Sequence, residues 1–192
     1  MKIILASGSP RRRELLDMAG FSFEVIPANV DETADPALSP DQLVTALSEK
    51  KAYHIQESLK EDAIIIGADT IVAIDGLILG KPDNKDDAFD MLMRLQGRPH
   101  TVFTGVTVLC LNNQKLKQKT FVESTKVFMR SLSQEEINDY IATGEPFDKA
   151  GAYGIQEKGA LLIERVEGDY FTVVGLPLCR LGMVLKSMMS GR

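Results

Sequence analysis

The chain of 192 residues has few cysteines and histidines, and this limits the metal and redox sites it can hold. Its two cysteines, Cys110 and Cys179, are far apart and form no CxxC pair, so we expect neither a disulfide framework nor a structural zinc site. Both lie among apolar residues, which predicts buried free thiols in a reducing compartment, the cytoplasm. Because His54 and His100 are the only histidines, a site of three histidines is excluded and a Ser-His-Asp triad is disfavoured.

The chain also lacks long apolar runs and an excess of basic residues. Too short an apolar run follows Met1 for a signal peptide, and Asp69 and Asp75 interrupt the longest candidate membrane span, so we expect no membrane partner. The net charge of −5 makes the chain a poor general binder of nucleic acid, and we expect no such partner. The sequence contains neither a Walker A motif nor a GxGxxG after a strand, which excludes an ordinary P-loop NTPase.

Apolar runs, capping boxes and turn signals predict helices and strands in alternation. We expect strands over 3–6, 21–25, 63–67, 71–74, 77–79, 102–111 and 119–129, helices over 10–19, 40–59, 84–97, 133–144 and from about 177, a loop over 29–38, and a turn at 167–169. Several strands are joined by hairpins, the clearest of them at Asp75-Gly76. The pattern therefore predicts an α/β fold with a mixed sheet in one domain.

The stretch 7–14 joins the first predicted strand to the first predicted helix. Ser9 suits the N-cap and Pro10 the first helical position, so backbone N–H groups of the helix N-terminus form a candidate anion site. The three arginines at 11–13 oppose the helix dipole by roughly 0.3–1 kcal/mol each. A bound phosphate chain would resolve that conflict, although a solvated charged face remains the alternative.

Acidic and lysine residues elsewhere in the chain are candidates for phosphate chemistry. Asp69 follows a predicted buried strand, at the edge where α/β proteins bind ligands, unless it merely caps a turn or bonds to Thr70. The acids at 31–32 are typical of a solvated loop, but near Asp69 they would suit Mg²⁺ or Mn²⁺. Lys51 and Lys81 are candidate phosphate binders, although a single lysine is more often a surface residue.

Residues 148–156 are rich in Gly and Ala and end in Gln156. Small residues let a backbone approach a ligand closely, and the glutamine amide offers donors and an acceptor on one flat group. The alternative is a tight loop that leads into a strand predicted at Leu161.

Together these segments resemble the Maf family, the so-called septum-formation proteins, in order and spacing along essentially the whole chain. The matching segments are Ser7-Gly8-Ser9-Pro10-Arg11-Arg12, Asp31-Glu32, Lys51-Ala52, Gly67-Ala68-Asp69-Thr70, Gly80-Lys81-Pro82, Gly97, the run from Asp148 to Gln156, Glu167-Gly168-Asp169-Tyr170 and Val174-Gly175-Leu176-Pro177-Leu178. Each motif alone is weak, whereas the ordered set is specific.

The resemblance implies a nucleoside triphosphate pyrophosphatase that uses a divalent metal, Mg²⁺ or Mn²⁺. It implies one domain over 1–192, with two lobes around a deep substrate cleft. Asp69 matches the proton acceptor, and Arg11, Thr70 and Gln156 match the three specificity positions in their dTTP/UTP form. A sister branch that resembles 7-methyl-GTP pyrophosphatases carries Trp after the Ser-Pro, Gln after the Asp and Glu in the late position, where this chain has Arg11, Thr70 and Gln156.

The expected site follows from the motifs and this resemblance. We assign Asp69, Lys51 and Lys81 to catalysis, Ser7, Ser9, Arg11, Arg12, Thr70 and Gln156 to substrate binding, and Glu32 with Asp69 to the metal. CTP is a further candidate substrate, and housecleaning of the nucleotide pool a candidate role. The sequence leaves open a homodimer and, as an alternative function, a nucleotide-binding regulator of cell division.

Overall fold

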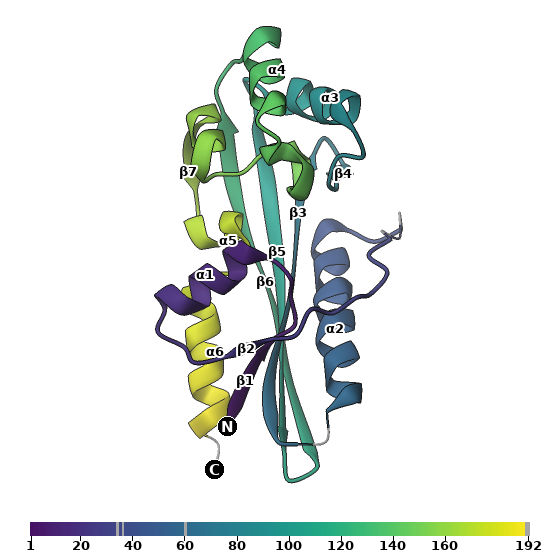
Figure 1. Cartoon of the computed structure of the whole chain (residues 1–192), viewed down its shortest axis with the longest axis vertical. Helices are drawn as coiled ribbons and strands as arrows, with labels where there is room; N and C mark the ends of the chain where they lie inside the picture. The colour runs from purple at the N-terminus through teal and green to yellow at the C-terminus, as the bar shows by residue number, and fades with distance from the viewer. Residues whose placement is uncertain (34, 36, 60, 191–192) are drawn as a thin grey trace. The chain divides into compact units, whose positions relative to one another are not determined.

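The computed structural model describes residues 1–33, 35, 37–59 and 61–190 of the chain (Figure 1). The predicted loop 29–38 therefore includes two positions, 34 and 36, that lie outside the described residues. The chain divides into two compact units. The first comprises Met1–Asp69, Thr104–Glu123 and the described residues from Gly175 onward, and the second comprises Thr70–Phe103 and Ser124–Val174.

Helices and strands alternate along the chain as predicted. The strands are β1 (Lys2–Leu5), β2 (Glu24–Val25), β3 (Ala63–Ile74), β4 (Leu77–Leu79), β5 (Pro99–Asn112), β6 (Lys115–Met129) and β7 (Ile163–Glu167). The helices are α1 (Pro10–Met18), α2 (Pro40–Ser58), α3 (Lys85–Leu95), α4 (Gln134–Ala142), α5 (Tyr170–Val174) and α6 (Leu178–Ser190), with short 3-10 helices at η1 (Glu145–Asp148), η2 (Ala150–Ala152) and η3 (Glu157–Leu162).

Within the described residues the strands form one mixed sheet, which confirms the predicted α/β fold. Its order is β2-β1-β3-β5-β6-β7, with β4 paired to β3. β1 runs parallel to β2 and to β3, whereas β4 is antiparallel to β3 and β7 is antiparallel to β6. Strands β3, β5 and β6 each contribute residues to both units.

Two strand predictions need correction. The predicted strand over 21–25 is reduced to the two residues of β2, both exposed. The separate strands predicted over 63–67 and 71–74 are one continuous strand, β3. Asp69 therefore lies inside a strand and not at its end.

Local turn and cap signals were interpreted correctly. The turn Asp75-Gly76 joins β3 to β4 with positive φ angles of 52° and 76°, as a tight hairpin requires. Ser133 caps α4: its hydroxyl accepts from the Glu136 N–H at 3.2 Å, and the Glu136 carboxylate accepts from the Ser133 N–H at 2.8 Å.

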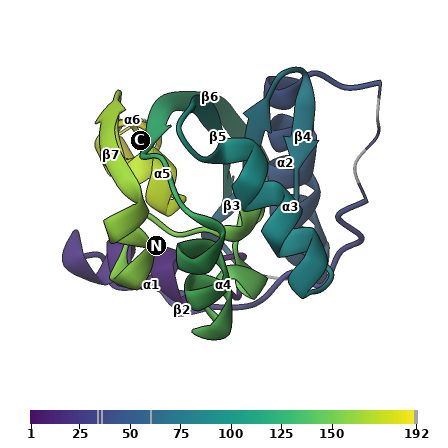
Figure 2. The same cartoon turned by 90° about the horizontal axis from the view of Figure 1, so that it is seen from above.

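In the first unit, α2 covers one face of the sheet, and α1 and α6 lie on the other side (Figures 1 and 2). Two glycines bring α2 close to the strands. A Cβ at Gly67 of β3 would lie 2.3 Å from the Ser48 carbonyl oxygen, and one at Gly105 of β5 would lie 2.4 Å from the Val44 carbonyl oxygen. Because both contacts are with helix backbone, the glycines set the depth at which α2 packs.

The second unit has an apolar core of its own. Helices α3 and α4 pack against each other there (Figure 2). Leu92 of α3, Ile137 of α4 and Val127 of β6 are completely buried in this core. A separate cluster that includes Ile4 and Leu109 is buried in the first unit, so each unit buries apolar surface of its own.

The cysteines only partly match expectation. Both are free, but Cys110 is buried whereas Cys179 is exposed, which corrects the prediction of two buried thiols. Cys179 lies off the helical stripe of α6 that buries Leu181, Leu185 and Met188. None of the described helices is long and apolar enough to cross a bilayer.

Candidate active site

The turn between β1 and α1 holds a buried arginine. Ser9 is the N-cap residue of α1, and its N–H donates to the hydroxyl of buried Ser7 at 3.2 Å. Arg12 donates from Nη1 to the same hydroxyl at 3.2 Å and from Nε to the Gly175 carbonyl oxygen at 2.8 Å. These bonds fix the orientation of the guanidinium of Arg12, a residue that is only 9% exposed.

The electrostatic surroundings of Arg12 explain how a buried cation is tolerated. Burial lowers the pKa of its guanidinium, and the charges of Asp69 and Glu32 raise it. Its neighbour Arg11, which is half-buried, lowers that pKa. The predicted substrate-binding arginine therefore lies within electrostatic range of the predicted catalytic and metal-binding carboxylates.

Lys51 joins those two carboxylates. Its Nζ lies 2.6 Å from Oδ1 of Asp69 and 2.7 Å from Oε1 of Glu32. The side chains of Lys51 and Asp69 are 7% and 9% exposed, whereas that of Glu32 is 44% exposed. The first unit thus brings together five predicted residues, Ser7, Arg12, Glu32, Lys51 and Asp69, from four segments of the chain.

The packing of α2 on β3 explains why Lys51 reaches Asp69. Gly67 lies two residues before Asp69, and a Cβ there would lie 2.8 Å from the N of Ala52, the neighbour of Lys51. The helix is also anchored by the Ser48 hydroxyl, which lies 2.9 Å from Oγ1 of Thr107 in β5. The buried carboxylate of Asp69 is therefore tolerated inside a strand, because α2 places the Lys51 ammonium within ion-pair distance of it.

Two further predicted residues, Ser9 and Arg11, also lie in the first unit, whereas Thr70, Lys81 and Gln156 belong to the second. Thr70 is half-buried in β3, next to Asp69 in the chain. Lys81 is exposed, and the preceding residue, Gly80, accepts a hydrogen bond from the Gly151 N–H at 2.9 Å. Gln156 is half-buried at the start of η3. The arrangement of these side chains around the carboxylates, and the cleft itself, stay predictions.

Several supporting residues were missed by the sequence analysis. The Gly175 carbonyl that holds Arg12 is a backbone atom, which no residue type signals. In the second unit, Lys149 is buried and donates to Oδ1 of Asp148 and to the Glu145 carbonyl oxygen, both at 2.8 Å. The position of Lys149 in the Gly- and Ala-rich run 148–156 could have indicated this supporting role. A lysine that such a segment buries needs hydrogen-bond or ion-pair partners nearby.

A second buried pair fixes the same run. The hydroxyl of Tyr153 lies 2.6 Å from Nε2 of His100, and both residues are buried. Burial lowers the pKa of His100 to about 4. The imidazole is therefore neutral, and it shares a hydrogen bond with the tyrosine hydroxyl three residues before Gln156.

The carboxylates suit a cation that a substrate helps to bind. Among the described residues, no group of three or more His, Cys, Asp or Glu side chains is placed to hold a metal ion. Glu32 and Asp69 nevertheless converge on one point, the Lys51 ammonium. Mg²⁺ commonly binds through one or two carboxylates together with substrate phosphates, so this pair fits such an ion.

Comparison with known proteins gives a consistent result. The model of a family described as Maf-like protein matches residues 2–188. A dTTP/UTP pyrophosphatase of Thermoanaerobacter sp. is 53% identical over 97% of this chain and 96% of its own length. Proteins with the same name from Bacillus pumilus and Bacillus cereus are 52% and 49% identical, over 97% and 96% of this chain and 96% and 94% of their own lengths.

A solved structure is more distantly similar. It is a nucleoside-triphosphatase, or dITP/XTP pyrophosphatase, from Mycobacterium abscessus, with a TM-score of 0.39 and 12% identity over 67% of this chain and 74% of that one. At this level the likeness indicates nothing about activity.

Proposed function

The chain belongs to the Maf family, and we propose that it hydrolyses dTTP and UTP to the nucleoside monophosphate and pyrophosphate. Relatives that are about half identical over nearly the whole chain carry that activity in their names. The observation that supports the chemistry is the ammonium of Lys51, held between Glu32 and Asp69 and accompanied by the buried Arg12. Housecleaning of the nucleotide pool would be its role in the cell.

Charge balance indicates how the site would receive a triphosphate. Arg12 and Lys51 carry two positive charges, and Glu32 and Asp69 carry two negative charges, so the four groups sum to zero. A triphosphate brings about four negative charges, and each uncompensated charge is costly where water is partly excluded. Further cations are therefore needed, and we assign this task to Arg11, Lys81, the α1 N-terminus and a divalent metal.

The buried residues divide the chemical tasks. The ammonium of Lys51 has three N–H donors; two go to the carboxylates, and the third would bind a phosphate oxygen. Arg12 would stabilise charge that builds up on the phosphate oxygens in the transition state. Water would attack the α-phosphorus, its proton would pass to Oδ2 of Asp69, and pyrophosphate would leave. The proton on Asp69 then returns to solvent.

A divalent metal, Mg²⁺ or Mn²⁺, would be held by Glu32 and Asp69. When bound, it supplies positive charge to phosphate oxygens and acidifies a water molecule. Glu32 is exposed enough to exchange its bond to Lys51 for such an ion. Asp69 would thus help to hold the metal as well as accept the proton.

We assign recognition of the base to Gln156, with Thr70 and Arg11 in support. The edge of uracil or thymine presents an acceptor, a donor and an acceptor, which a glutamine amide can pair with. The Lys149 and Tyr153 contacts would hold the backbone that carries Gln156. A flipped amide would still pair with cytosine, so we expect CTP to be rejected less strongly than ATP or GTP.

The alternative is a nucleotide-binding regulator of cell division. Binding alone gains nothing from two carboxylates placed beside a polyanion, because they weaken affinity for the ground state. No feature of the described residues favours this alternative over hydrolysis.

The test is phosphorus NMR of the products formed from UTP and dTTP with Mg²⁺ or Mn²⁺, with EDTA as the control. We expect pyrophosphate as the primary product and no turnover in EDTA. Asp69→Asn should lower kcat by about 10²–10⁴-fold, whereas Asp31→Asn, whose carboxylate bonds to Thr33, should not. Orthophosphate as the primary product, or nucleotide binding without turnover, would contradict the proposal.

A further inference from the structure

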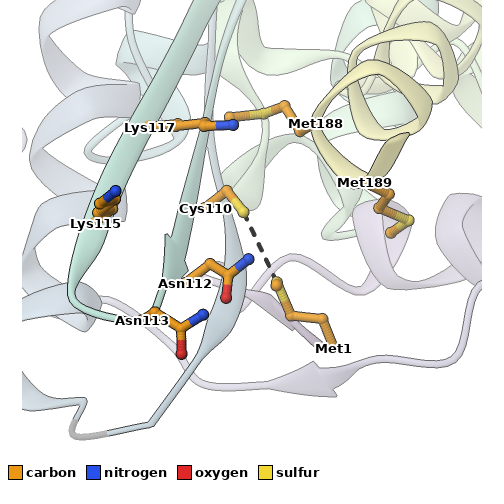
Figure 3. Close-up of a pocket in the computed structure, with 8 residues that line it drawn as sticks. All are labelled: Met1, Cys110, Asn112, Asn113, Lys115, Lys117, Met188 and Met189. Carbon is orange, nitrogen blue, oxygen red and sulfur yellow. Dashed lines mark hydrogen bonds between the residues drawn. The ribbon is translucent and has the colours of Figure 1, made fainter. Parts of the chain in front are cut away.

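A cavity in the first unit is lined by several sulfur-bearing side chains and shares no residue with the candidate active site. It has a volume of about 400 Å³ and lies where the β5–β6 hairpin approaches the end of α6 (Figure 3). Four sulfur-bearing side chains line it: Met1, Cys110, Met188 and Met189. Among its described lining residues there is no histidine and no carboxylate.

Two of the sulfur atoms are already placed as metal ligands would be. Sγ of Cys110 lies 3.7 Å from Sδ of Met1, and Figure 3 shows the two side chains pointing toward each other. Two sulfur ligands, each roughly 2.3 Å from a tetrahedral metal ion, stand about 3.8 Å apart. Cys110 is 3% exposed and Met188 is 8% exposed, so a thiol and a thioether are buried along the same cavity.

We propose that this cavity binds one soft monovalent metal ion, Cu(I). Thiolate and thioether sulfur are the ligands that Cu(I) selects, whereas Mg²⁺ and Mn²⁺ require oxygen. One thiolate neutralises one positive charge, which leaves a neutral complex whose thiolate ligand is buried. A dication such as Zn²⁺ would keep an uncompensated charge near Lys115 and Lys117, which also line the cavity.

Binding involves no electron transfer. Cu(I) displaces the thiol proton of Cys110, the proton goes to the buffer, and a Cu–S bond forms. The thioethers of Met1 and Met188 complete the coordination as neutral ligands. The ion would thereby link the residue before β1 to β5 and α6, three segments that are distant in sequence.

The chain offers matched controls for each ligand. Cys179 is an exposed thiol on α6 and does not line the cavity. Met183 is an exposed methionine on the same helix, 62% exposed. Replacing either should leave the site intact. Leucine in place of Met188 keeps the apolar volume and removes only the sulfur, so that variant should fold.

The experiment is an anaerobic titration of the full chain with Cu(I) against bicinchoninate, a chromophoric competitor. Wild type, Cys179→Ser and Met183→Leu should each take up one ion with the same affinity. Met188→Leu should bind at least about tenfold more weakly, and Cys110→Ser should leave the ion with the competitor.

A thermal melt with one equivalent of Ag(I), a redox-stable substitute, gives a second readout. The Tm should rise in Cys179→Ser and stay unchanged in Cys110→Ser. Equal affinity in Met188→Leu and wild type, or uptake retained by Cys110→Ser, would overturn the proposal. Pyrophosphatase activity without added copper should be the same in all these variants, so this test is independent of the proposed function.

Discussion

Replacing Gly67 by alanine should separate Lys51 from Asp69. The new Cβ would lie 2.3 Å from the Ser48 carbonyl oxygen, whereas ordinary contact begins at 3.4 Å, so α2 must retreat by about 1 Å. A similar displacement of Lys51 would stretch its 2.6 Å bond to Asp69 to about the limit of a hydrogen bond.

The magnitudes follow from packing and from positioning. Overpacking of this kind costs about 1–3 kcal/mol of unfolding free energy. A misplacement of about 1 Å at a catalytic group costs about 10²-fold in rate. We therefore expect Gly67→Ala to remain folded with a lowered Tm and to lose about two orders of magnitude in kcat/KM for UTP.

Calorimetry and a pyrophosphate-release assay measure the two effects. The matched control is Gly182→Ala on α6, where a Cβ meets no atom within 4 Å. There the helix propensity of alanine should add up to about 1 kcal/mol of stability without changing activity. Wild-type Tm and activity in Gly67→Ala would refute the inference that this glycine sets the depth of α2. If that variant does not fold, Lys51→Met, with exposed Lys186→Met on α6 as the control, tests the same bond.

Three further predictions concern recognition, phosphate binding and pH. Gln156→Ala should reduce the preference for UTP over ATP by about 10–100-fold in a kcat/KM series; an unchanged preference would remove Gln156 from base recognition. Arg12→Lys should raise the KM for UTP, because a lysine cannot make both buried bonds, whereas exposed Arg13→Gln should not; equal KM values would contradict the role of the guanidinium. The pKa of His100 is about 4 in the folded protein and 6.5 in its ordinary state, so the unfolded chain binds more protons between these values. The unfolding free energy should therefore fall by up to about 3 kcal/mol as pH drops through this window, and urea unfolding of His100→Gln should show a smaller fall.

The sequence predicted which charged residues come together better than it predicted the elements that carry them. Arg12, Glu32, Lys51 and Asp69 were assigned from motifs, and the structure brings them together. Asp69 was expected at a strand end because a carboxylate interrupts an apolar run. That expectation was wrong because the ion-pair partner of Asp69 is Lys51, which lies on a helix and 18 residues earlier in the sequence. A tertiary ion pair of this kind cannot be seen in the local pattern of apolar and polar residues.

Other features were beyond sequence reasoning for similar reasons. The Gly175 carbonyl oxygen holds Arg12, but backbone acceptors are alike at every residue. The exposure of Cys179 depends on which stripe of α6 faces the strands, and its apolar neighbours in sequence do not determine that stripe. Turns were easier to predict, since Asp75-Gly76 and the Ser133 capping box act through local chemistry.

The bond between Arg12 and Gly175 spans 163 residues, and this distance has a consequence for synthesis on the ribosome. Arg12 leaves the ribosome early, but its carbonyl partner is translated only when most of the chain has emerged. Until then the guanidinium lacks one of the two bonds that orient it. A nascent or prematurely terminated chain therefore cannot orient Arg12 as the finished chain does, and the proposed phosphate site would become competent only in a nearly completed chain.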